Sequence, residues 1–417
     1  MEKYFIDLFA GAGGLAEGFV ANGFTPLAHV EMNKNACDSL ITRLAYHYLK
    51  NNGNINFYYD YLKQTISRDA MLSHIDKDII SSVINKTIND ETIDGIFDEI
   101  DSRIIKHNAR VDAIIGGPPC QAYSLVGRST LGERVKTDKR NWLFKLYIKF
   151  LKKYKPQVFV FENVAGLLSA SGGLYFEELM SDLKAAGYNI EHRLLDASDF
   201  GVLQSRKRII IIGTRSDLPR GDLYPTKKTA FEKYIVNDLL NDLPPLIDKI
   251  EDNHYFGPIS EYCRKTGIRT NKDVLTQHIT RYNNQRDKEI YKKAIQLWNK
   301  SKARLNYNSL PERLKTHKNR KSFVDRFKVV AGESHCSHTV LAHLAKDGHY
   351  FIHPDLKQCR SISVREAARL QSFPDSYYFE GSRGSAFTQI GNAVPPLLSC
   401  EIAKQIFKYL EGIKHDV

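Results

Sequence analysis

The stretch FIDLFAGAGGLAEGF, residues 5–19, decides the fold class of this 417-residue chain. The apolar residues 4–9 predict a buried strand, and a glycine-rich turn follows directly. Gly11, Gly13 and Ala16 fit the G-x-G-x-x-G/A spacing, in which glycine permits a tight turn and lets a ligand approach the backbone closely. The stretch therefore predicts a strand, a ligand-binding turn and a helix at the start of an α/β domain.

An acidic residue supports the ligand-binding interpretation of this turn. Glu31 lies twenty positions after Gly11, at the end of the next predicted strand, 26–30. There its carboxylate could accept hydrogen bonds from both hydroxyls of a ribose. These features fit a dinucleotide and S-adenosylmethionine equally well, and a turn that serves packing alone is the third alternative.

Beyond this turn, short apolar segments alternate with helical patterns. This order is typical of a doubly wound, mainly parallel α/β sheet. The further strand candidates are residues 55–59, 111–115, 158–162, 189–195 and 208–213. A polar, helix-like stretch at about 61–109 is too long for a plain connection, so we interpret it as an insertion.

The alternation stops after Gly213. Residues 216–355 are polar and basic with scattered aromatic side chains, which predicts a smaller second domain inserted into the first. Residues 356–417 then return to the domain formed by residues 1–215.

Two helices are predicted in the returning segment. Ser363 and Glu366 form a capping-box pattern for a helix at 363–373. Pro395-Pro396 opens an amphipathic helix at 397–410.

The formal net charge of +12 indicates a polyanionic partner. Residues 311–330 have a local basic excess, with only Glu312 and Asp325 opposing it, and such an excess is what phosphate contact needs. The basic residues are Arg313, Lys315, Lys318, Arg320, Lys321, Arg326 and Lys328. A generally lysine-rich proteome would also give a positive chain, and that alternative stays open here.

Several classes of protein are disfavoured by composition. No apolar run approaches the roughly 20 residues of a membrane-spanning helix, and the first residues leave no room for a signal peptide, so we expect a cytoplasmic protein without a membrane partner. Six scattered cysteines without a CxxC pair argue against a disulfide framework. The histidines and cysteines of residues 335–359 fit no zinc spacing, so we expect no metal.

Cys120, in GGPPCQAYS at residues 116–124, is the candidate nucleophile. It follows the strand 111–115 and two prolines, which fix φ and stiffen the loop. The thiol would thus be held at the mouth of the sheet. The alternative is a small buried hydrophobic residue.

Two further motifs place polar side chains near this loop. Glu162, in FENVAGL, lies at the carboxyl end of the strand 158–161 and should face the same crevice as Cys120, where it could donate a proton to a ring nitrogen; a helix cap is the alternative. In QSRKRIIIIG, Gln204, Arg206 and Arg208 alternate at strand spacing and so share a face. Together they could grip planar or anionic oxygens, although a solvated strand edge would look similar.

The last motif is QIGNAVPP, residues 389–396. Gly391-Asn392 indicates a turn, and the helix that begins after it would direct backbone donors toward that turn. An ordinary loop is the alternative.

Taken in chain order, these motifs resemble those of the cytosine-C5 DNA methyltransferases of prokaryotic restriction-modification systems. The resemblance rests on FIDLFAGAGG, Glu31, GGPPCQAYS, ENV, QSRKR, RSISVREAARLQSFPD at 360–375 and QIGNAVPP. Each motif alone is weak, but all of them in this order are specific. The family's fold implies a Rossmann-like, S-adenosylmethionine-dependent catalytic domain with an inserted target recognition domain, here residues 216–355.

The resemblance also implies the chemistry of a DNA (cytosine-5-)-methyltransferase. Cys120 resembles the nucleophile that adds to C6 of a cytosine flipped out of the duplex. Glu162 resembles the residue that engages N3 and the exocyclic amine, and Arg208, supported by Arg206, resembles the contact to O2. The substrate contacts expected beside them are Gln121, Ser124 and Gln204.

The cofactor and partners follow from the same resemblance. The residues that match the family's S-adenosylmethionine site are Asp7, Phe9, Gly11, Gly13, Glu31, Asp60, Pro118, Asn392 and Val394. Double-stranded DNA is the expected partner. We expect a monomer that is paired in function with a restriction endonuclease, without a stable complex.

Two rival functions account for part of the sequence. A nicotinamide oxidoreductase would explain the glycine turn and Glu31 but gives no role to Cys120 and Glu162 together. A methyltransferase of the same chemistry acting on transfer RNA is closer, and the large basic middle segment favours duplex DNA over it.

Overall fold

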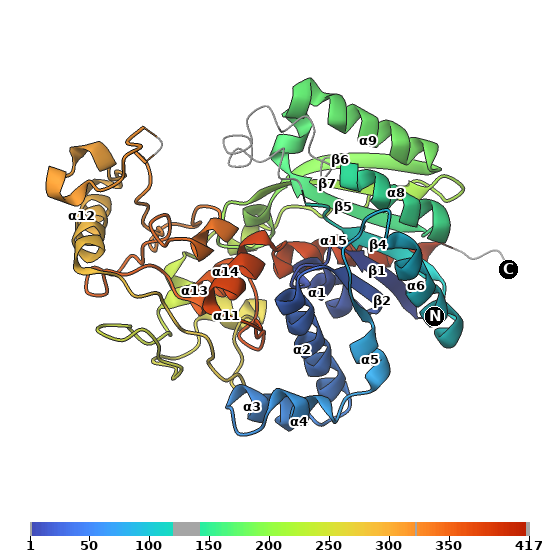
Figure 1. The fold of residues 1–417 in the computed structure, drawn as a ribbon, viewed down its shortest axis with the longest axis horizontal. Coiled ribbons are helices and arrows are strands. Elements are labelled where there is room, and N and C mark those ends of the chain that lie inside the picture. Colours follow the sequence, from blue (N-terminus) through green and yellow to red (C-terminus); the bar gives the residue numbers. More distant parts are fainter. Residues whose placement is uncertain (1, 120–141, 322, 414–417) are drawn as a thin grey trace.

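A computed structural model describes residues 2–119, 142–321 and 323–413. Seven strands form one sheet in the order β3-β2-β1-β4-β5-β7-β6. In chain order they are β1 (Lys3–Leu8), β2 (Phe24–Glu31), β3 (Val83–Asn85), β4 (Val111–Gly116), β5 (Val158–Val164), β6 (Tyr188–Asp196) and β7 (Lys207–Arg215). β7 runs antiparallel to both neighbours, and the pairs among β1 to β5 are parallel. The predicted doubly wound, mainly parallel sheet is confirmed (Figure 1).

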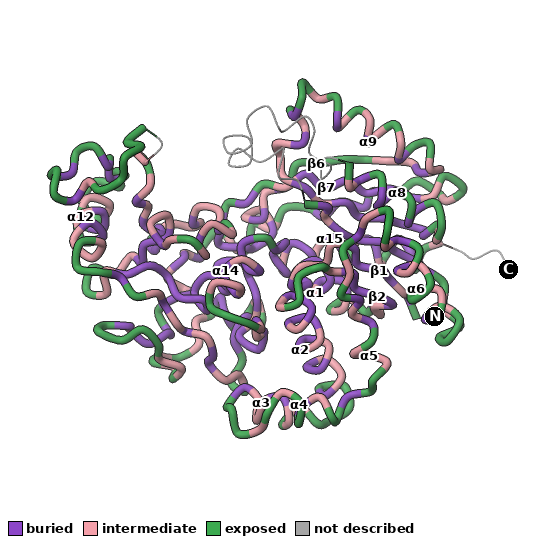
Figure 2. Tube along the Cα trace, viewed as in Figure 1, coloured by how far each residue is buried: buried purple, intermediate pink, exposed green. Residues whose placement is uncertain are grey.

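Helices cover both faces of this sheet. One face packs against α6 (Ile93–His107), α8 (Leu143–Tyr154) and α9 (Leu174–Ala185). The other face packs against α1 (Gly14–Ala21) and α15 (Pro396–Gly412). Successive strand residues serve opposite layers, as Ile114 and Ile115 do, and the buried residues follow the sheet through the middle of the molecule (Figure 2). This is why the central strands have no polar alternation in the sequence.

The helix α15, at the C-terminal end of the described chain, packs against α1 near its N-terminal end. A Cβ atom on Gly18 would lie 2.3 Å from the backbone nitrogen of Cys400, so α1 and α15 approach with their backbones nearly in contact. The helix predicted at 397–410 is confirmed and begins one residue earlier. Residues 356–413 therefore rejoin the domain in which the chain began.

The structure corrects the prediction for residues 55–109. The strand predicted at 55–59 is wrong: these residues enter the helix α3 (Asn56–Leu62), in which Tyr58 and Leu62 are buried at helical spacing. The proposed insertion contains the edge strand β3, which pairs with β2. Three residues are too few for a periodic signal, and aromatic side chains at 57–59 suggested a strand. The neighbouring helices are α2 (Lys34–Asn51), α4 (Arg68–Leu72) and α5 (Lys77–Ser81).

The middle region is largely irregular, with α10 (Asn237–Leu240), α11 (Glu261–Thr266) and α12 (Gln285–Ser301) as its α-helices among the described residues. α12 lies at the end of the molecule far from the sheet and has a hydrophobic cluster of its own (Figure 1). The inner part shares one core with α13 (Val364–Leu370) and the glycine turn. Only the outer part of this region thus packs as an independent unit.

Two helices precede α15. α13 begins with the predicted capping box, in which Ser363 and Glu366 each bond to the other's backbone nitrogen. α14 (Arg383–Asn392) was not predicted, because its sequence RGSAFTQIGN resembles a loop in composition.

Candidate functional site

The strand order identifies one edge of the sheet as the site. From β1 the order runs outward through β2 and β3 on one side and through β4 and β5 on the other. Connections that leave in opposite directions open a crevice at the carboxyl ends of the central strands. The glycine turn follows β1, and residues 117–119 follow β4, so the predicted motifs meet at this crevice.

The glycine turn has the geometry of a ligand cradle. Gly11 has φ +55°, and a Cβ atom there would meet nothing within 4 Å, so its backbone borders open space. Phe9 also has positive φ (56°), a strained conformation for a residue other than glycine. The Gly11 nitrogen donates to Glu31 Oε2 (2.9 Å), and the Asn33 nitrogen donates to Glu31 Oε1 (2.7 Å). Burial raises the pKa of Glu31, and these two hydrogen bonds oppose that rise.

Two predicted cofactor residues have other surroundings. Asp7 is 1% exposed, and His29 Nδ1 lies 3.0 Å from its Oδ2; burial raises its pKa. Asp60 lies on α3, after the 18-residue helix α2, and not at a strand end. Asp7 is therefore buried inside the sheet beside His29, and Asp60, which the resemblance placed at the cofactor site, lies on a helix.

Two residues beside Glu31 were not identified from the sequence: Asn85, at the end of β3, and Met32, which follows β2. Asn85 Nδ2 donates to the backbone oxygens of Glu31 and Met32, each at 3.0 Å. The Met32 side chain is 64% exposed, which leaves an apolar surface beside the Glu31 carboxylate. The register of the parallel pair places Asn85 opposite Glu31, but a strand of three residues gave no signal from which to find it.

The loop after β4 packs against the end of β5. A Cβ atom on Gly117 would lie 2.5 Å from Glu162 Oε2, so only glycine leaves room for this carboxylate. Pro118 is buried, and its carbonyl oxygen accepts from Asn163 Nδ2 (3.1 Å). The predicted residues Cys120, Gln121 and Ser124 lie outside the described residues.

Glu162 and Arg208 form the charged centre of the crevice. Arg208 Nε lies 2.8 Å from Glu162 Oε1, and the two side chains are 11% and 12% exposed. The antiparallel register pairs Glu162 with Ile210, so Arg208 is its diagonal neighbour on the same face. Burial lowers the pKa of Arg208, and the Glu162 charge counteracts this. The structure thus brings together two residues that lie on different strands and far apart in the sequence.

Arg206 and Gln204 lie beneath this pair. Arg206 is fully buried and donates to the backbone oxygens of Val340 (2.8 Å) and Gly391 (3.1 Å). Burial, and then the charge of Arg208, lowers the pKa of Arg206. Gln204 is also fully buried, and its amide is engaged by Leu370, Gln371 and Val340. Its predicted contact with substrate is replaced by a structural role.

Asn392 and Val394 adjoin the start of α1. Asn392 is exposed at the last position of α14, so the turn predicted at 391–392 is the end of a helix. A Cβ atom on Gly14 would lie 2.3 Å from the Val394 carbonyl oxygen. Val394 therefore lies close to the glycine turn, and Asn392 precedes it by two residues.

Comparison with known proteins agrees with this geometry. The family model of C-5 cytosine-specific DNA methylases matches residues 4–59 and 62–408. The chain belongs to this family. It is similar to the type II methyltransferase M.Bpa9945I of Bacillus paralicheniformis, with 39% identity over 98% of this chain and 99% of that protein. M.AgeI of Thalassovita gelatinovora is 30% identical over 96% of this chain and 98% of its own length.

Solved structures show the same fold at lower identity. The Entamoeba histolytica methyltransferase EhMeth has a TM-score of 0.57 with 14% identity over 98% of the methylase and 99% of that chain. The S. pombe Dnmt2 methyltransferase has a TM-score of 0.54 with 15% identity over the same shares. The methylase is thus a DNA (cytosine-5-)-methyltransferase with a Rossmann-like methyltransferase fold.

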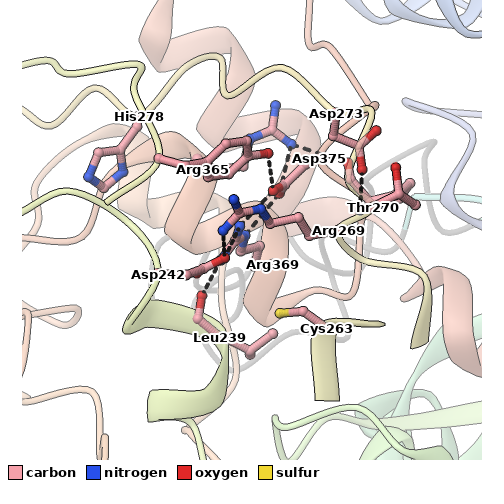
Figure 3. A network of polar contacts seen from close by, with 12 residues as sticks. Leu239, Asp242, Cys263, Arg269, Thr270, Asp273, His278, Arg365, Arg369 and Asp375 are labelled. Atoms are coloured by element: carbon pink, nitrogen blue, oxygen red, sulfur yellow. Dashed lines mark hydrogen bonds and ion pairs between the residues drawn. The ribbon is translucent and has the colours of Figure 1, made fainter. Parts of the chain in front are cut away.

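A buried charge cluster joins the middle region of the methylase to α13 (Figure 3). Arg369 bonds to Asp375 through Nε (2.9 Å) and Nη2 (2.6 Å), and to Asp242 through both Nη atoms. Asp242 also binds Arg269, and Tyr255 donates to Asp375 (2.6 Å). The charge of Arg369 lowers the pKa of Asp375 although burial opposes this. The cluster fixes the middle region beside the site.

Most cations of the basic segment 311–330 form ion pairs in the structure. Among its described side chains, five of the seven cations pair with carboxylates: Arg313 with Glu289, Lys315 and Arg320 with Glu312, Arg326 with Asp347 and Lys328 with Asp325. Arg313 and Arg320 are 66% and 47% exposed, and exposed pairs are weak. Phosphate groups could therefore replace the carboxylate partners of Arg313 and Arg320 at a small cost in free energy.

The histidines of 335–353 bond mainly within the protein. His335 lies 2.9 Å from the Tyr234 carbonyl oxygen, and His338 bonds to that of Tyr350. Burial lowers the pKa of His338 to about 4 and that of His353 to about 3. In the described part of the chain, no three His, Cys, Asp or Glu side chains are grouped to hold a metal ion. The helices described there include none that is long and apolar enough to cross a membrane.

Proposed function

We propose that the methylase transfers a methyl group from S-adenosylmethionine to C5 of a cytosine flipped out of a specific site in double-stranded DNA. The observation that carries this proposal is the Glu162–Arg208 pair, 2.8 Å apart and packed against Gly117. It lies at the same edge of the sheet as the turn that binds Glu31. One crevice therefore has a place for a base and a place for a nucleoside.

The charged pair suits the pairing edge of cytosine. That edge presents an acceptor at O2, an acceptor at N3 and a donor at the exocyclic amine. Arg208 would donate to O2, and Glu162 would donate to N3 when protonated and accept from the amine. Because the ion pair holds the two side chains next to each other, both can reach one base. A stacked base could not present this edge and its C6 together, so flipping is required.

Cys120 would perform the covalent step. Its thiolate adds to C6, the new sulfur–carbon bond shifts electron density to C5, and a proton from Glu162 at N3 neutralises the charge. S-adenosylmethionine, when bound, supplies an electrophilic methyl group for C5. Loss of the C5 proton to solvent then expels the Cys120 thiolate and restores the C5–C6 double bond, and N3 returns its proton to Glu162.

The chain's own groups fit this cofactor. Both Glu31 oxygens are oriented by backbone donors from Gly11 and Asn33, which aims their free lone pairs at ribose hydroxyls. Met32 and Asn85, beside Glu31, would contact the adenine in place of Asp60. The remaining wall would come from Phe9, Gly13, Pro118, Asn392 and Val394.

The biological role follows from the relatives. Proteins named type II methyltransferases match nearly the whole chain, which supports protection of DNA from a cognate restriction endonuclease. The methylase would act as a monomer and would pair with that endonuclease in function, without a stable complex.

Three measurements test the proposal. Bisulfite sequencing of DNA from cells that express the protein should show 5-methylcytosine at one short sequence. In vitro, duplex DNA should accept methyl groups while a transfer RNA transcript does not. Cys120→Ser should abolish transfer and leave binding of S-adenosylhomocysteine within about threefold of the wild type, because it removes only the covalent step. Transfer by this variant at the wild-type rate would refute the mechanism.

A further inference from the structure

Beneath the crevice, three fully buried side chains connect its cofactor side with its base side. They are Gln204, Arg206 and Gln371. Gln371 follows α13 directly and belongs to neither the cofactor set nor the base set described above. Its amide group can donate and accept at once, which suits a residue that joins two segments.

On the cofactor side, Gln371 holds the end of α14. Its Nε2 donates to the carbonyl oxygens of Ile390 (2.7 Å) and Ala393 (3.4 Å). These residues flank Asn392, which is exposed toward solvent at the end of the helix. The last carbonyl groups of a helix lack the usual partners within it, so the bonds from Gln371 help to fix this segment.

On the base side, the same amide holds the segment before β7. Gln371 Oε1 accepts from Gln204 Nε2 (3.0 Å), and Gln204 Oε1 accepts from the Val340 nitrogen (2.7 Å). Arg206 then donates to the Val340 oxygen and to the Gly391 oxygen. The bonds therefore close a ring that passes from Gln371 through the base-side strand and returns to the end of α14.

This ring is connected to the reacting groups at two points. Arg208, two residues after Arg206 on the same face, pairs with Glu162. Asn392 lies between Gly391 and Ala393, which both accept ring bonds. The packing is tight here as well, because a Cβ atom on Gly391 would lie 2.1 Å from the Ala342 nitrogen. A shift in the ring would move the two half-sites relative to each other.

We propose that Gln371 is a positioning residue that aligns the cofactor loop 390–394 with the base-binding strand 204–208. This inference rests on the proposed function. Transfer between two bound molecules depends steeply on their relative placement, and a misplacement of about 1 Å can cost on the order of 100-fold in rate. Each half-site keeps its own contacts without Gln371, so the rate should fall more than either affinity.

The test compares Gln371→Met, which keeps the volume but removes the hydrogen bonds, with a matched control. Gln389, on α14, is also buried, donates to Glu380 O (2.9 Å) and Ser385 Oγ (3.1 Å), and accepts from Ser39 Oγ (2.6 Å). Gln389→Met thus removes the same number of hydrogen bonds outside the ring. A second variant, Gln371→Glu, keeps an acceptor for Gln204 and removes the donor to Ile390.

The readouts are the single-turnover methyl-transfer rate at saturating cofactor and DNA, and the two dissociation constants, for S-adenosylhomocysteine and for DNA. We expect Gln371→Met to lower the rate about 100-fold and Gln371→Glu at least about tenfold, with both dissociation constants within about threefold of the wild type. Gln389→Met should keep the wild-type rate.

Three results would overturn the inference. They are a wild-type rate in both Gln371 variants, an equal loss in Gln389→Met, and failure of the Gln371 variants to fold while Gln389→Met folds. The last would show that the ring maintains the fold instead of aligning the site. If the wild-type protein itself transfers nothing to cytosine C5, it is the proposed function that fails.

Discussion

Replacing Arg369 with methionine should destabilise the methylase strongly. All five N–H groups of this guanidinium have acceptors: Asp375 and Asp242 take two bonds each, and the Leu239 carbonyl oxygen takes the fifth at 2.6 Å. The side chain is fully buried, as is Asp375, and Asp242 is 3% exposed. Methionine fills similar space but supplies neither charge nor donors.

The size of the loss in unfolding free energy depends on the two buried carboxylates that remain when Arg369 is removed. Without Arg369, Asp375 keeps Tyr255 and a distant Arg365 nitrogen at 3.9 Å, and Asp242 keeps Arg269. The buried Asp375 carboxylate is then left with one hydrogen bond and one long ion pair. Removing one partner of a buried ion pair costs about 3–5 kcal/mol of unfolding free energy. Arg369→Lys, which keeps the charge with fewer donors, should lose less.

The assay is urea unfolding at pH 7, followed by fluorescence and circular dichroism. Arg193→Met is the matched control, because Arg193 is 45% exposed in its pairs with Glu191 and Asp222 and should change stability by less than about 1 kcal/mol. A loss below about 1 kcal/mol for Arg369→Met would refute the reasoning.

The pH dependence gives a second check on the same variant. Arg369 lowers the pKa of Asp375, so the stability from this pair is present above the ordinary pKa of an aspartate and is lost as the pH falls through the folded-state value. In Arg369→Met, burial without the arginine should raise that pKa. The stability gap between the two proteins should therefore be large at pH 7 and should shrink as the pH falls, first through the raised pKa of Asp375 in the variant and then towards its lowered pKa in the wild type. A gap that grows on acidification would contradict this.

Two further predictions concern substrate binding. Gly117→Ala should lower methyl transfer at least about tenfold with little effect on binding of S-adenosylhomocysteine, because the added Cβ would lie 2.5 Å from Glu162 Oε2. The control Gly384→Ala, whose Cβ would be in ordinary contact at 3.8 Å, should transfer methyl groups normally, and equal rates in the two variants would be inconsistent with this placement of Glu162. The logarithm of the affinity for duplex DNA should fall linearly with the logarithm of salt concentration. Replacing Arg313 and Arg320 with alanine should reduce that slope by about one for each phosphate that the protein no longer neutralises, and an unchanged slope would mean that the DNA does not contact these two arginines.

Much of the fold and site could be predicted from local sequence. Strands buried on both faces show as apolar runs, and glycine and proline mark where each run ends, which is why β1, β4 and β5 were placed correctly. Edge elements were not: β3 is too short for a pattern, and residues 55–59 have strand-like side chains in a helix.

The sequence alone determined the class of sheet and the glycine turn that is followed by Glu31, because each of these depends on local patterns in the chain. The tertiary structure decided which residue of a motif lines the crevice and which is buried below it. Gln204 bonds to Leu370 across 166 residues, and Arg369 bonds to Asp242 across 127. Partners so far apart are brought together only by the packing of the middle region against α13, and no local pattern contains that contact.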